Sequence, residues 1–235
     1  MQRLTGEHTN SKFKAARHTL QDVFRSVSPE TPDAFAASST LLHLCKGQKL
    51  FAVGETPRAV YVVTQGCLKV VCEGPEGEST ITGLIRSGDV IGIREVCLES
   101  RYSRTSVALL DTIVCALDAQ TVVARVKRDP LLGEYFMRFF AGELIRLERR
   151  LDDRLHTSAY ARVARIMAQL YEMFGTGDEP VFHLPLNRRD IAELADVTPE
   201  TVSRALSELK HSGVLQASGA TFRVLDGGAL RAAAE

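Results

Sequence analysis

The sequence predicts an α+β protein with an N-terminal antiparallel β-roll, a long helix and a C-terminal winged helix-turn-helix. Three observations predict this order. Short β-rich runs separated by glycines extend from residue 40 to about 117, apolar residues then repeat every three or four positions through 130–157, and two short amphipathic helices followed by two apolar runs occupy 186–226. With 235 residues, 45% of them hydrophobic and 25% charged, the chain has an ordinary globular composition and enough length for two domains.

The first 20 residues are polar, with four basic residues against one acidic residue, and predict a flexible N-terminal arm. One or two short helices are expected between residues 20 and 40. The β-roll is placed at residues 21–129, with a hairpin turn in EGPEGES (residues 73–79). Its strands are expected in six runs: TLLHLC, AVYVVT, CLKVVCE, STITGLI, RTSVAL and DTIVCAL.

A long helix is predicted over residues 130–157, because proline is favourable at the first helical position and an apolar stripe follows at helical spacing. A stripe of this length favours a parallel homodimer, although such a helix could instead pack on its own roll. The residues expected in the dimer interface are Met137, Phe140, Leu144, Leu147 and Leu151.

Two short helices are predicted next, over residues 186–197 and 199–209. Thr198 can cap the second helix, and Pro199 stands where a missing backbone N–H costs nothing. Because so few residues separate the helices, they must cross sharply, and the small Ala192 suits the point of contact.

Gly213 suits the end of the second helix, and two apolar runs follow, broken at residues 218–220. This pattern is typical of a hairpin that flanks the two helices. We therefore expect a winged helix-turn-helix domain over residues 158–235.

The second helix carries a polar stripe whose members are spaced i, i+3 and i+4. The simplest interpretation of such a stripe is a solvated surface. In a helix-turn-helix, however, this helix enters the major groove, where arginine can donate to guanine, glutamate can accept from cytosine, and serine can bond a base or a phosphate. The predicted DNA contacts are Glu200, Ser203, Arg204, Thr198 and Thr201, with phosphate contacts from Arg188, Arg189 and Lys210.

Overall charge does not indicate a partner, because 29 basic residues balance 29 acidic ones. From residue 160 onward, 8 basic residues face 10 acidic ones, a net charge of −2. Phosphate contacts would therefore depend on where individual basic residues lie. We expect the DNA affinity of one subunit to depend only modestly on salt concentration.

Other classes of protein find little support. No apolar run is long enough to cross a bilayer and no signal peptide is evident, which predicts a cytoplasmic protein without a membrane partner.

Five cysteines without a close pair predict neither a disulfide framework nor a metal site. Cys72 and Cys115 fit strand positions, whereas Cys97 falls in an irregular segment where a redox role stays open. A catalytic cupin-like barrel would need clustered histidines, but His43 is the only histidine between residues 20 and 155, so no enzyme is expected.

In combination, these features resemble the Crp/Fnr family of bacterial transcription regulators over residues 20–228. The motifs are KGQKLFAVGETPRAVYVVTQGCLKV, SGDVIG and LNRRDIAELADVTPETVSRALSELKHSGVL. The resemblance implies a roll like that of cyclic-nucleotide-binding domains, a homodimer on palindromic double-stranded DNA and, if the protein is an activator, RNA polymerase as a further partner.

The resemblance also bears on the operator. Glu200, Ser203 and Arg204 match the E-x-x-S-R pattern of the Fnr-like branch, and Pro199 stands where the cyclic-AMP receptor branch carries arginine. A half-site like TTGAT is therefore expected rather than TGTGA. Asp196 stands where the turn prefers glycine, and aspartate tolerates the left-handed conformation.

The family's cyclic-nucleotide cassette begins G-E-L and ends R-S or R-T. Arg104 and Thr105 match its end, but Ile93 replaces the glutamate and the loop is one residue longer, so that Glu95 could substitute only with a backbone shift. The resemblance thus implies Arg104, Thr105 and Glu95 as effector-binding residues. It leaves open a roll that senses another signal or acts without a ligand, and, as the alternative, a cyclic-nucleotide-dependent regulator.

No cofactor is identified. The family's oxygen-sensing branch needs an N-terminal cysteine set for its iron–sulfur cluster, and this chain has no cysteine before Cys45. Haem stays open, because His18, His43 and His156 could serve as ligands. A cyclic-nucleotide module that controls a partner protein without binding DNA is a third hypothesis, and the complete helix-turn-helix argues against it.

Overall fold

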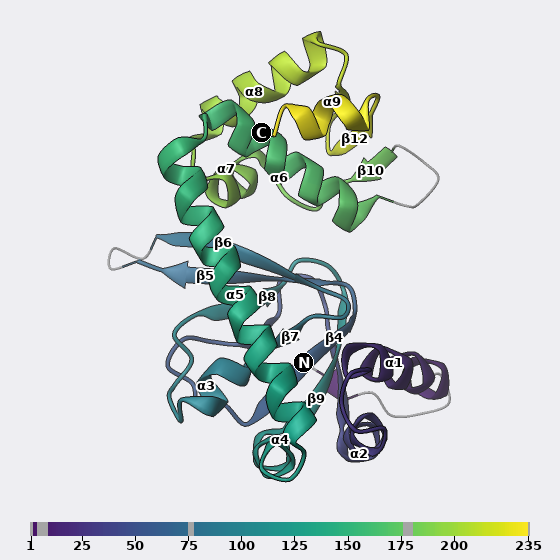
Figure 1. Ribbon diagram of the computed structural model, residues 1–235. Coiled ribbons are helices and arrows are strands. Elements are labelled where there is room, and N and C mark those ends of the chain that lie inside the picture. The colour runs from purple at the N-terminus through teal and green to yellow at the C-terminus, as the bar shows by residue number, and fades with distance from the viewer. Residues whose placement is uncertain (1, 4–8, 75–77, 176–180, 235) are drawn as a thin grey trace. The chain divides into compact units, whose positions relative to one another are not determined.

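The computed structural model describes residues 2–3, 9–74, 78–175 and 181–234. The chain divides into two compact units, residues 1–143 and 144–235. The long helix α5 (Pro130–His156) contributes to both units (Figure 1).

The first unit is a β-roll flanked by helices. In chain order its elements are β1 (Gln2–Arg3), α1 (Thr9–Val23), α2 (Glu30–Ser38), β2 (Thr40–Leu44), β3 (Lys49–Phe51), β4 (Ala59–Gln65), β5 (Cys67–Glu73), β6 (Ser79–Arg86), β7 (Val90–Ile91), α3 (Ile93–Cys97), β8 (Thr105–Ala108), β9 (Thr112–Asp118), α4 (Ala119–Val126) and the first half of α5.

The strands form two antiparallel sheets, with the orders β1-β2-β9-β4-β7 and β3-β8-β5-β6, which confirms the predicted fold class. Each of the six predicted apolar runs contains a strand. Glu73 pairs with Ser79 at the end of the β5–β6 hairpin, while residues 75–77 of the predicted turn lie outside the described residues.

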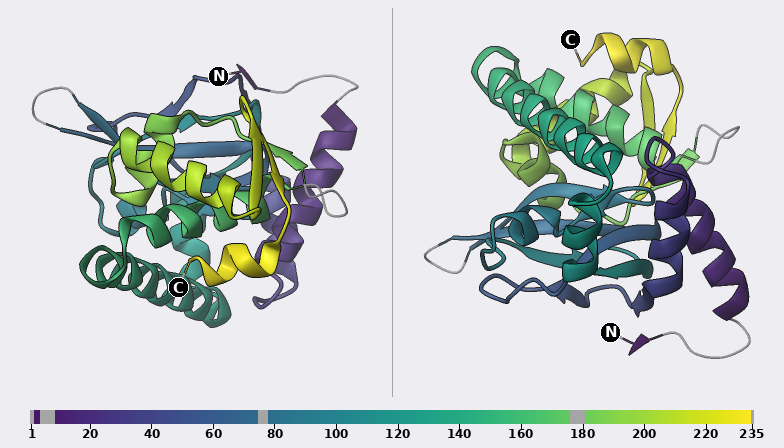
Figure 2. Two further views of the ribbon diagram at one scale, coloured as in Figure 1. Left: turned by 90° about the horizontal axis from the view of Figure 1, so that it is seen from above. Right: turned by 60° about the horizontal axis from the view of Figure 1, so that its bottom comes forward.

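Strand alternation builds two cores from the same sheet, because successive side chains of a strand point to opposite faces. On β4, Val60 and Val62 face the helices α1, α2, α4 and α5, while Tyr61 and Val63 face the interior of the roll. This is why the run AVYVVT is apolar at nearly every position. The helices cover one side of the roll (Figures 1 and 2).

Gly66 is the residue between β4 and β5, where the chain passes from one sheet to the other. Its φ of 88° lies in the left-handed region, and a Cβ atom here would collide with the carbonyl oxygen of Asp111 and with Thr112. Only glycine fits this position without rearrangement.

The expected flexible arm over residues 1–20 is wrong for residues 2–3, which pair with β2 as strand β1, and for residues 9–20. Residues 9–20 belong to α1, whose apolar side buries Ala16 and Leu20 in the core that the helices share with the roll. Two apolar residues one helical turn apart were too weak a signal among the polar residues around them.

The helix α5 begins at Pro130 and extends to His156, against an expected range of 130–157. Asp129 precedes it and accepts hydrogen bonds from the backbone N–H groups of Leu131 (3.1 Å) and Leu132 (3.4 Å). The N–H of Leu132 also donates to the Asp129 carbonyl (3.1 Å), so Asp129 caps the first turn through both its side chain and its backbone.

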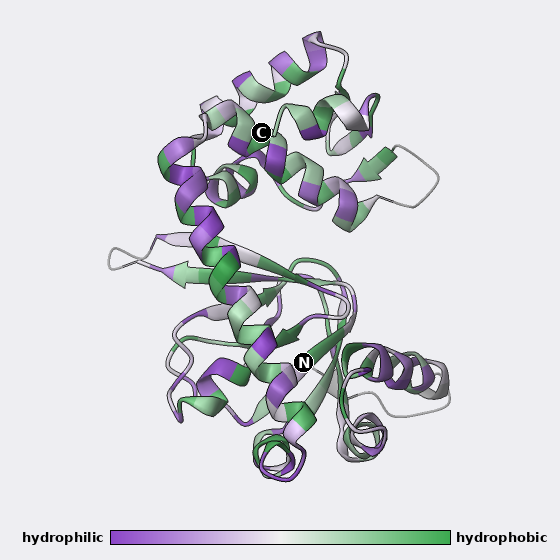
Figure 3. Cartoon of the chain, viewed as in Figure 1, coloured by the Kyte–Doolittle hydropathy of each residue, from purple (hydrophilic) through white to green (hydrophobic). Residues whose placement is uncertain are grey.

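The apolar stripe of α5 is largely uncovered. Met137, Leu144, Leu147 and Leu151 are 67%, 57%, 64% and 58% exposed. Phe140 differs from the other predicted interface residues, because it is half-buried against the helical core of its own unit. Apolar and hydrophilic residues alternate along the helix (Figure 3).

The second unit has the predicted winged helix-turn-helix. After the end of α5 it contains α6 (Ala159–Phe174), β10 (Val181–His183), α7 (Arg188–Ala195), α8 (Pro199–His211), β11 (Leu215–Ser218), β12 (Thr221–Val224) and α9 (Gly227–Ala232). The strands pair in the order β10-β12-β11, and the β11–β12 hairpin adjoins α8 (Figure 2). The sequence did not predict β1, β3, β7, β10, α3, α4, α6 or α9.

Candidate nucleic-acid interface

The first helix of the pair, α7, is positioned by a capping box and a buried side. The side chain of Asn187 accepts from the N–H of Asp190 (3.0 Å), and the Asp190 carboxylate accepts from the N–H of Asn187 (2.9 Å). Ile191, Ala192 and Ala195 are buried. The small Ala192 therefore lies in the packed side of the helix, as the sequence predicted.

The turn between the two helices depends on Asp196, which adopts the left-handed conformation (φ 54°, ψ 48°). Aspartate tolerates this region better than most residues. Its carboxylate also forms an ion pair with Arg150 of α5, with Nε and Oδ2 3.2 Å apart.

A second arginine holds the same turn. Arg162 of α6 donates to the carbonyl oxygens of Ala195 (3.1 Å) and Asp196 (3.3 Å), as well as to that of Thr157 (2.7 Å). It thereby satisfies carbonyls at the end of α7 that lack helical partners. Sequence reasoning missed Arg150 and Arg162, since no local pattern links them to a turn more than 30 residues away.

The second helix, α8, starts as its sequence predicts. Thr198 is its N-cap and accepts from the N–H of Thr201 (3.3 Å), and Pro199 is the first helical residue. Its apolar side is buried in the unit's core through Val202, Ala205, Leu206 and Leu209. This burial fixes the rotation of α8 about its axis and directs the opposite side to solvent.

The structure brings the predicted base contacts together on that solvent side. Glu200, Ser203 and Arg204 are all exposed. Ser203 donates to the carbonyl oxygen of Pro199 (3.0 Å), and Arg204 Nη2 donates to Thr201 Oγ1 (3.2 Å).

The pKa of Glu200 is lowered by its own backbone N–H, by a hydrogen bond with Thr198 and by the charge of Arg204. The carboxylate is therefore ionised at neutral pH and can only accept hydrogen bonds. The stripe thus offers a hydrogen-bond acceptor and a guanidinium donor one turn apart on an exposed helix.

The predicted phosphate contacts have different surroundings. The guanidinium of Arg188 lies over the ring of Phe222, 5.8 Å from its centroid, and desolvation lowers its pKa. Arg189 forms an ion pair with Glu193 (3.2 Å) within α7, whereas Lys210 is exposed near the end of α8. All three are in the helix-turn-helix, and Arg189 uses Nε for this pair and has further N–H donors for a phosphate.

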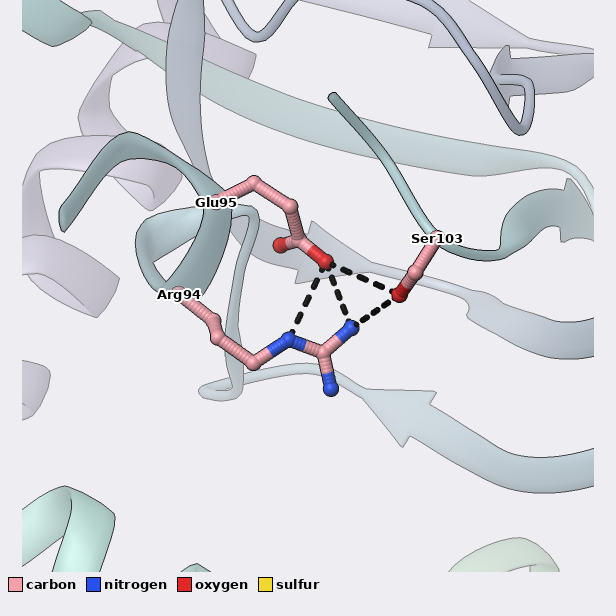
Figure 4. Close-up of polar contacts among 3 residues, drawn as sticks. All are labelled: Arg94, Glu95 and Ser103. Atoms are coloured by element: carbon pink, nitrogen blue, oxygen red, sulfur yellow. Dashed lines mark hydrogen bonds and ion pairs between the residues drawn. The ribbon is translucent and has the colours of Figure 1, made fainter. Parts of the chain in front are cut away.

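In the roll, Glu95 does not present a free carboxylate. The residue is 6% exposed, and its Oε1 accepts from Arg94 Nε (3.1 Å) and Nη2 (2.5 Å) (Figure 4). Ser103 joins the cluster, 2.8 Å from Arg94 Nη2 and 3.5 Å from Glu95 Oε1. To bind a ribose hydroxyl, the Glu95 carboxylate would have to share or leave its contact with Arg94.

The remaining cassette residues lie in different surroundings. Ile93, at the glutamate position, is buried in the core that the helices share with the roll. Thr105 donates to Glu73 Oε1 (2.8 Å), so a carboxylate lies beside one of the residues that the resemblance implies for effector binding. Arg104 is half-buried.

The cysteines give no sign of an activated thiol. Cys97 is exposed and ends the short helix α3, although an irregular segment was expected. Partial desolvation raises its pKa, which keeps the thiol protonated and weakly nucleophilic at neutral pH. Burial raises the pKa of Cys67 to about 12 and that of Cys115 to about 11.

Among the described residues, no group of three or more histidine, cysteine or acidic side chains could hold a metal ion, and no helix is long and apolar enough to span a membrane.

Comparisons with known proteins match both units. The Crp-like helix-turn-helix domain family matches residues 161–233, and the cyclic nucleotide-binding domain family matches residues 41–129. The chain is 26% identical over 208 residues to a CRP-like cAMP-activated global transcriptional regulator of Mycobacterium tuberculosis, covering 87% of this chain and 92% of that protein. It is 28% identical over 191 residues to the fumarate and nitrate reduction regulatory protein of Salmonella typhimurium, covering 80% and 76%. The structure of FixK2 from Bradyrhizobium japonicum is similar with a TM-score of 0.73 at 24% identity, covering 84% of this chain and 98% of that one.

Proposed function

Because the chain belongs to the Crp/Fnr family and is a DNA-binding transcription regulator of that type, we propose that it binds as a homodimer to a palindrome of TTGAT-like half-sites. The observation that carries this proposal is the exposed stripe of Glu200, Ser203 and Arg204 on a capped and firmly packed α8.

In the proposed complex, α8 lies in the major groove with its first two turns at the base edges. Arg204 donates to O6 and N7 of the guanine in the half-site, and Glu200 accepts from a cytosine amino group. Ser203 already donates to the Pro199 carbonyl, so its oxygen is left to accept from a base amino group, whereas a phosphate contact requires the hydroxyl to rotate and donate.

The homodimer is supported by the apolar stripe on α5. Its uncovered members, Met137, Leu144, Leu147 and Leu151, repeat at coiled-coil spacing, and an exposed apolar stripe of this kind is typical of a buried interface. Two copies of α8 related by a two-fold axis would meet half-sites about one helical turn of DNA apart, which requires a palindrome.

For the roll, we propose that DNA binding needs no cyclic nucleotide. The residues of this chain do not fit that ligand: Ile93 offers no acceptor for a ribose hydroxyl, Glu95 is bound to Arg94, and Glu73 brings a negative charge to Thr105. A carboxylate at that hydroxyl would repel a cyclic phosphate.

A cyclic-nucleotide-dependent regulator is the second candidate. It is favoured by the match of residues 41–129 to the cyclic nucleotide-binding domain family and by the relative whose printed name is cAMP-activated. If the protein acts as an activator, RNA polymerase would be a further partner.

One experiment separates the two candidates: selection of bound duplexes from a random DNA pool by the purified protein, with and without cyclic AMP. Recovery of a TTGAT-like palindrome in both samples supports the proposal. Recovery only with the nucleotide supports the second candidate, and recovery of no palindrome in either sample contradicts the proposed operator.

A further inference from the structure

We propose that Thr201 is a positioning residue that holds the Arg204 guanidinium ready to read guanine before DNA is bound. This inference rests on the proposed function, in which Arg204 contacts the base. It adds a specificity role for a side chain that need not touch the base itself.

The geometry links three side chains at the start of α8. Arg204 Nη2 lies 3.2 Å from Thr201 Oγ1, and Thr201 Oγ1 lies 3.2 Å from Thr198 Oγ1. Thr198 is also the N-cap of this helix. The proposed base-reading residue Arg204 is therefore hydrogen-bonded to the capped first turn of α8.

The chemistry of arginine determines the direction of the first bond. A guanidinium can only donate, so Thr201 Oγ1 accepts from Arg204. Between the two threonine hydroxyls, either oxygen can be the donor. Thr198 Oγ1 also accepts from the backbone N–H of Thr201, which it caps at 3.3 Å.

This arrangement matters because arginine is long and exposed and would otherwise sample many rotamers. Ordering such a side chain costs free energy on binding, and a contact that orders it beforehand removes part of that cost. Arg204 uses one N–H for Thr201 and has further donors for a bidentate guanine contact. From the usual cost of immobilising one such side chain, loss of the Thr201 hydroxyl should reduce guanine discrimination about three- to tenfold.

The test compares Thr201→Val with Thr201→Ser in the full-length protein. Valine keeps the shape of threonine and the backbone N–H that Thr198 caps, but it has no hydroxyl. Serine keeps the hydroxyl and lacks the methyl group. Thermal unfolding of each variant checks that α8 is intact.

Guanine discrimination is measured by fluorescence anisotropy as a ratio of two dissociation constants. One duplex carries the palindrome with guanine at the predicted position, and the other carries 7-deazaguanine there, which lacks the N7 acceptor. The same ratio is measured for Arg204→Ala and for the double variant Thr201→Val, Arg204→Ala.

We expect Thr201→Val to reduce the ratio three- to tenfold, Thr201→Ser to keep it within about twofold of the wild-type value, and Thr201→Val to have no further effect once Arg204 is removed. A wild-type ratio for Thr201→Val, or an equal loss for the serine variant, would overturn the positioning role. The same holds if the loss persists without Arg204. If Arg204→Ala itself keeps the full ratio, the proposed base contact fails instead, and the two failures are thereby distinguished.

Discussion

At the scale of single residues, the proposed specificity and affinity belong to different side chains. Arg204 is exposed on the first turns of α8 and is proposed to contact a base, whereas Lys210 is exposed near the end of α8 and is proposed to contact a phosphate. Base contacts discriminate between sequences, and phosphate contacts do not.

We predict that Arg204→Ala costs about 1–3 kcal/mol of binding free energy per half-site and relaxes the preference for guanine. Lys210→Ala should weaken binding to all sequences alike and reduce the slope of log affinity against log salt by about 1. Anisotropy titrations with the palindrome and with random duplex DNA measure both effects. An equal loss on the two DNAs for Arg204→Ala would refute its base contact.

Asp129 is the residue at which a pH effect on stability is expected. Desolvation raises its pKa, but hydrogen bonds from Thr31, Ser28 and the N–H groups of Leu132 and Leu131 outweigh that effect and lower it below its ordinary value of 3.8. The strongest of these, from Thr31 Oγ1, is 2.8 Å long and connects α2 to the start of α5.

Because the pKa of Asp129 is lowered in the folded protein, its ionised form stabilises the fold above pH 3.8, and that stabilisation is lost as the pH falls through the lowered value. We predict that Asp129→Asn costs about 1 kcal/mol at neutral pH, as the loss of a good cap does. Urea unfolding from pH 3 to 7 checks this. The difference in free energy of unfolding between wild type and variant should shrink towards pH 3. A difference that does not depend on pH would show that the charge of Asp129 is not involved.

At the scale of elements, each half of α5 has a different environment. Its first half packs Leu132 and Phe136 into the core of the roll unit, and its second half brings Arg150 to the turn of the helix-turn-helix. Arg162 of α6 supports the same turn. The exposed stripe remains available for a partner copy.

We predict that Leu147→Glu converts the homodimer to monomers, since it buries a charge in the proposed interface. Leu147 is 64% exposed in the single chain, so the same change should leave the unfolding of the protomer nearly unaffected. Sedimentation equilibrium measures the mass. Arg149→Glu is the control, because it adds a glutamate on the side of α5 away from the stripe, and a dimeric Leu147→Glu variant would exclude this interface.

At the scale of the whole molecule, the two candidate functions differ in whether the roll must bind a small molecule before α8 can bind DNA. A ligand that binds the folded state raises stability by about 2.7 kcal/mol at 100 times its dissociation constant. Because Glu95 is bonded to Arg94 and Thr105 is bonded to Glu73, we predict that millimolar cyclic AMP changes neither the midpoint of thermal unfolding nor the affinity for the palindrome. A rise of several degrees would restore the cyclic-nucleotide-dependent candidate, and AMP is the matched control.

The sequence by itself determined the elements whose signals are local. Alternation with period two marked the six strands, and spacing of three and four together with Pro130 marked α5. Thr198, Pro199 and Gly213 marked the two ends of α8. These signals depend only on residues that are close together along the chain. The placement of Glu200 and Arg204 one helical turn apart is local in the same way.

Only the tertiary structure decided which distant residues meet. It buried part of the expected arm through Leu20, half-buried Phe140 against its own core, and paired Glu73 with Thr105. It also brought Arg150 to Asp196, 46 residues away. Such contacts depend on packing between elements rather than on periodicity within one element. A sequence pattern can therefore mark a residue as apolar or charged, but it does not identify the distant residue that it contacts.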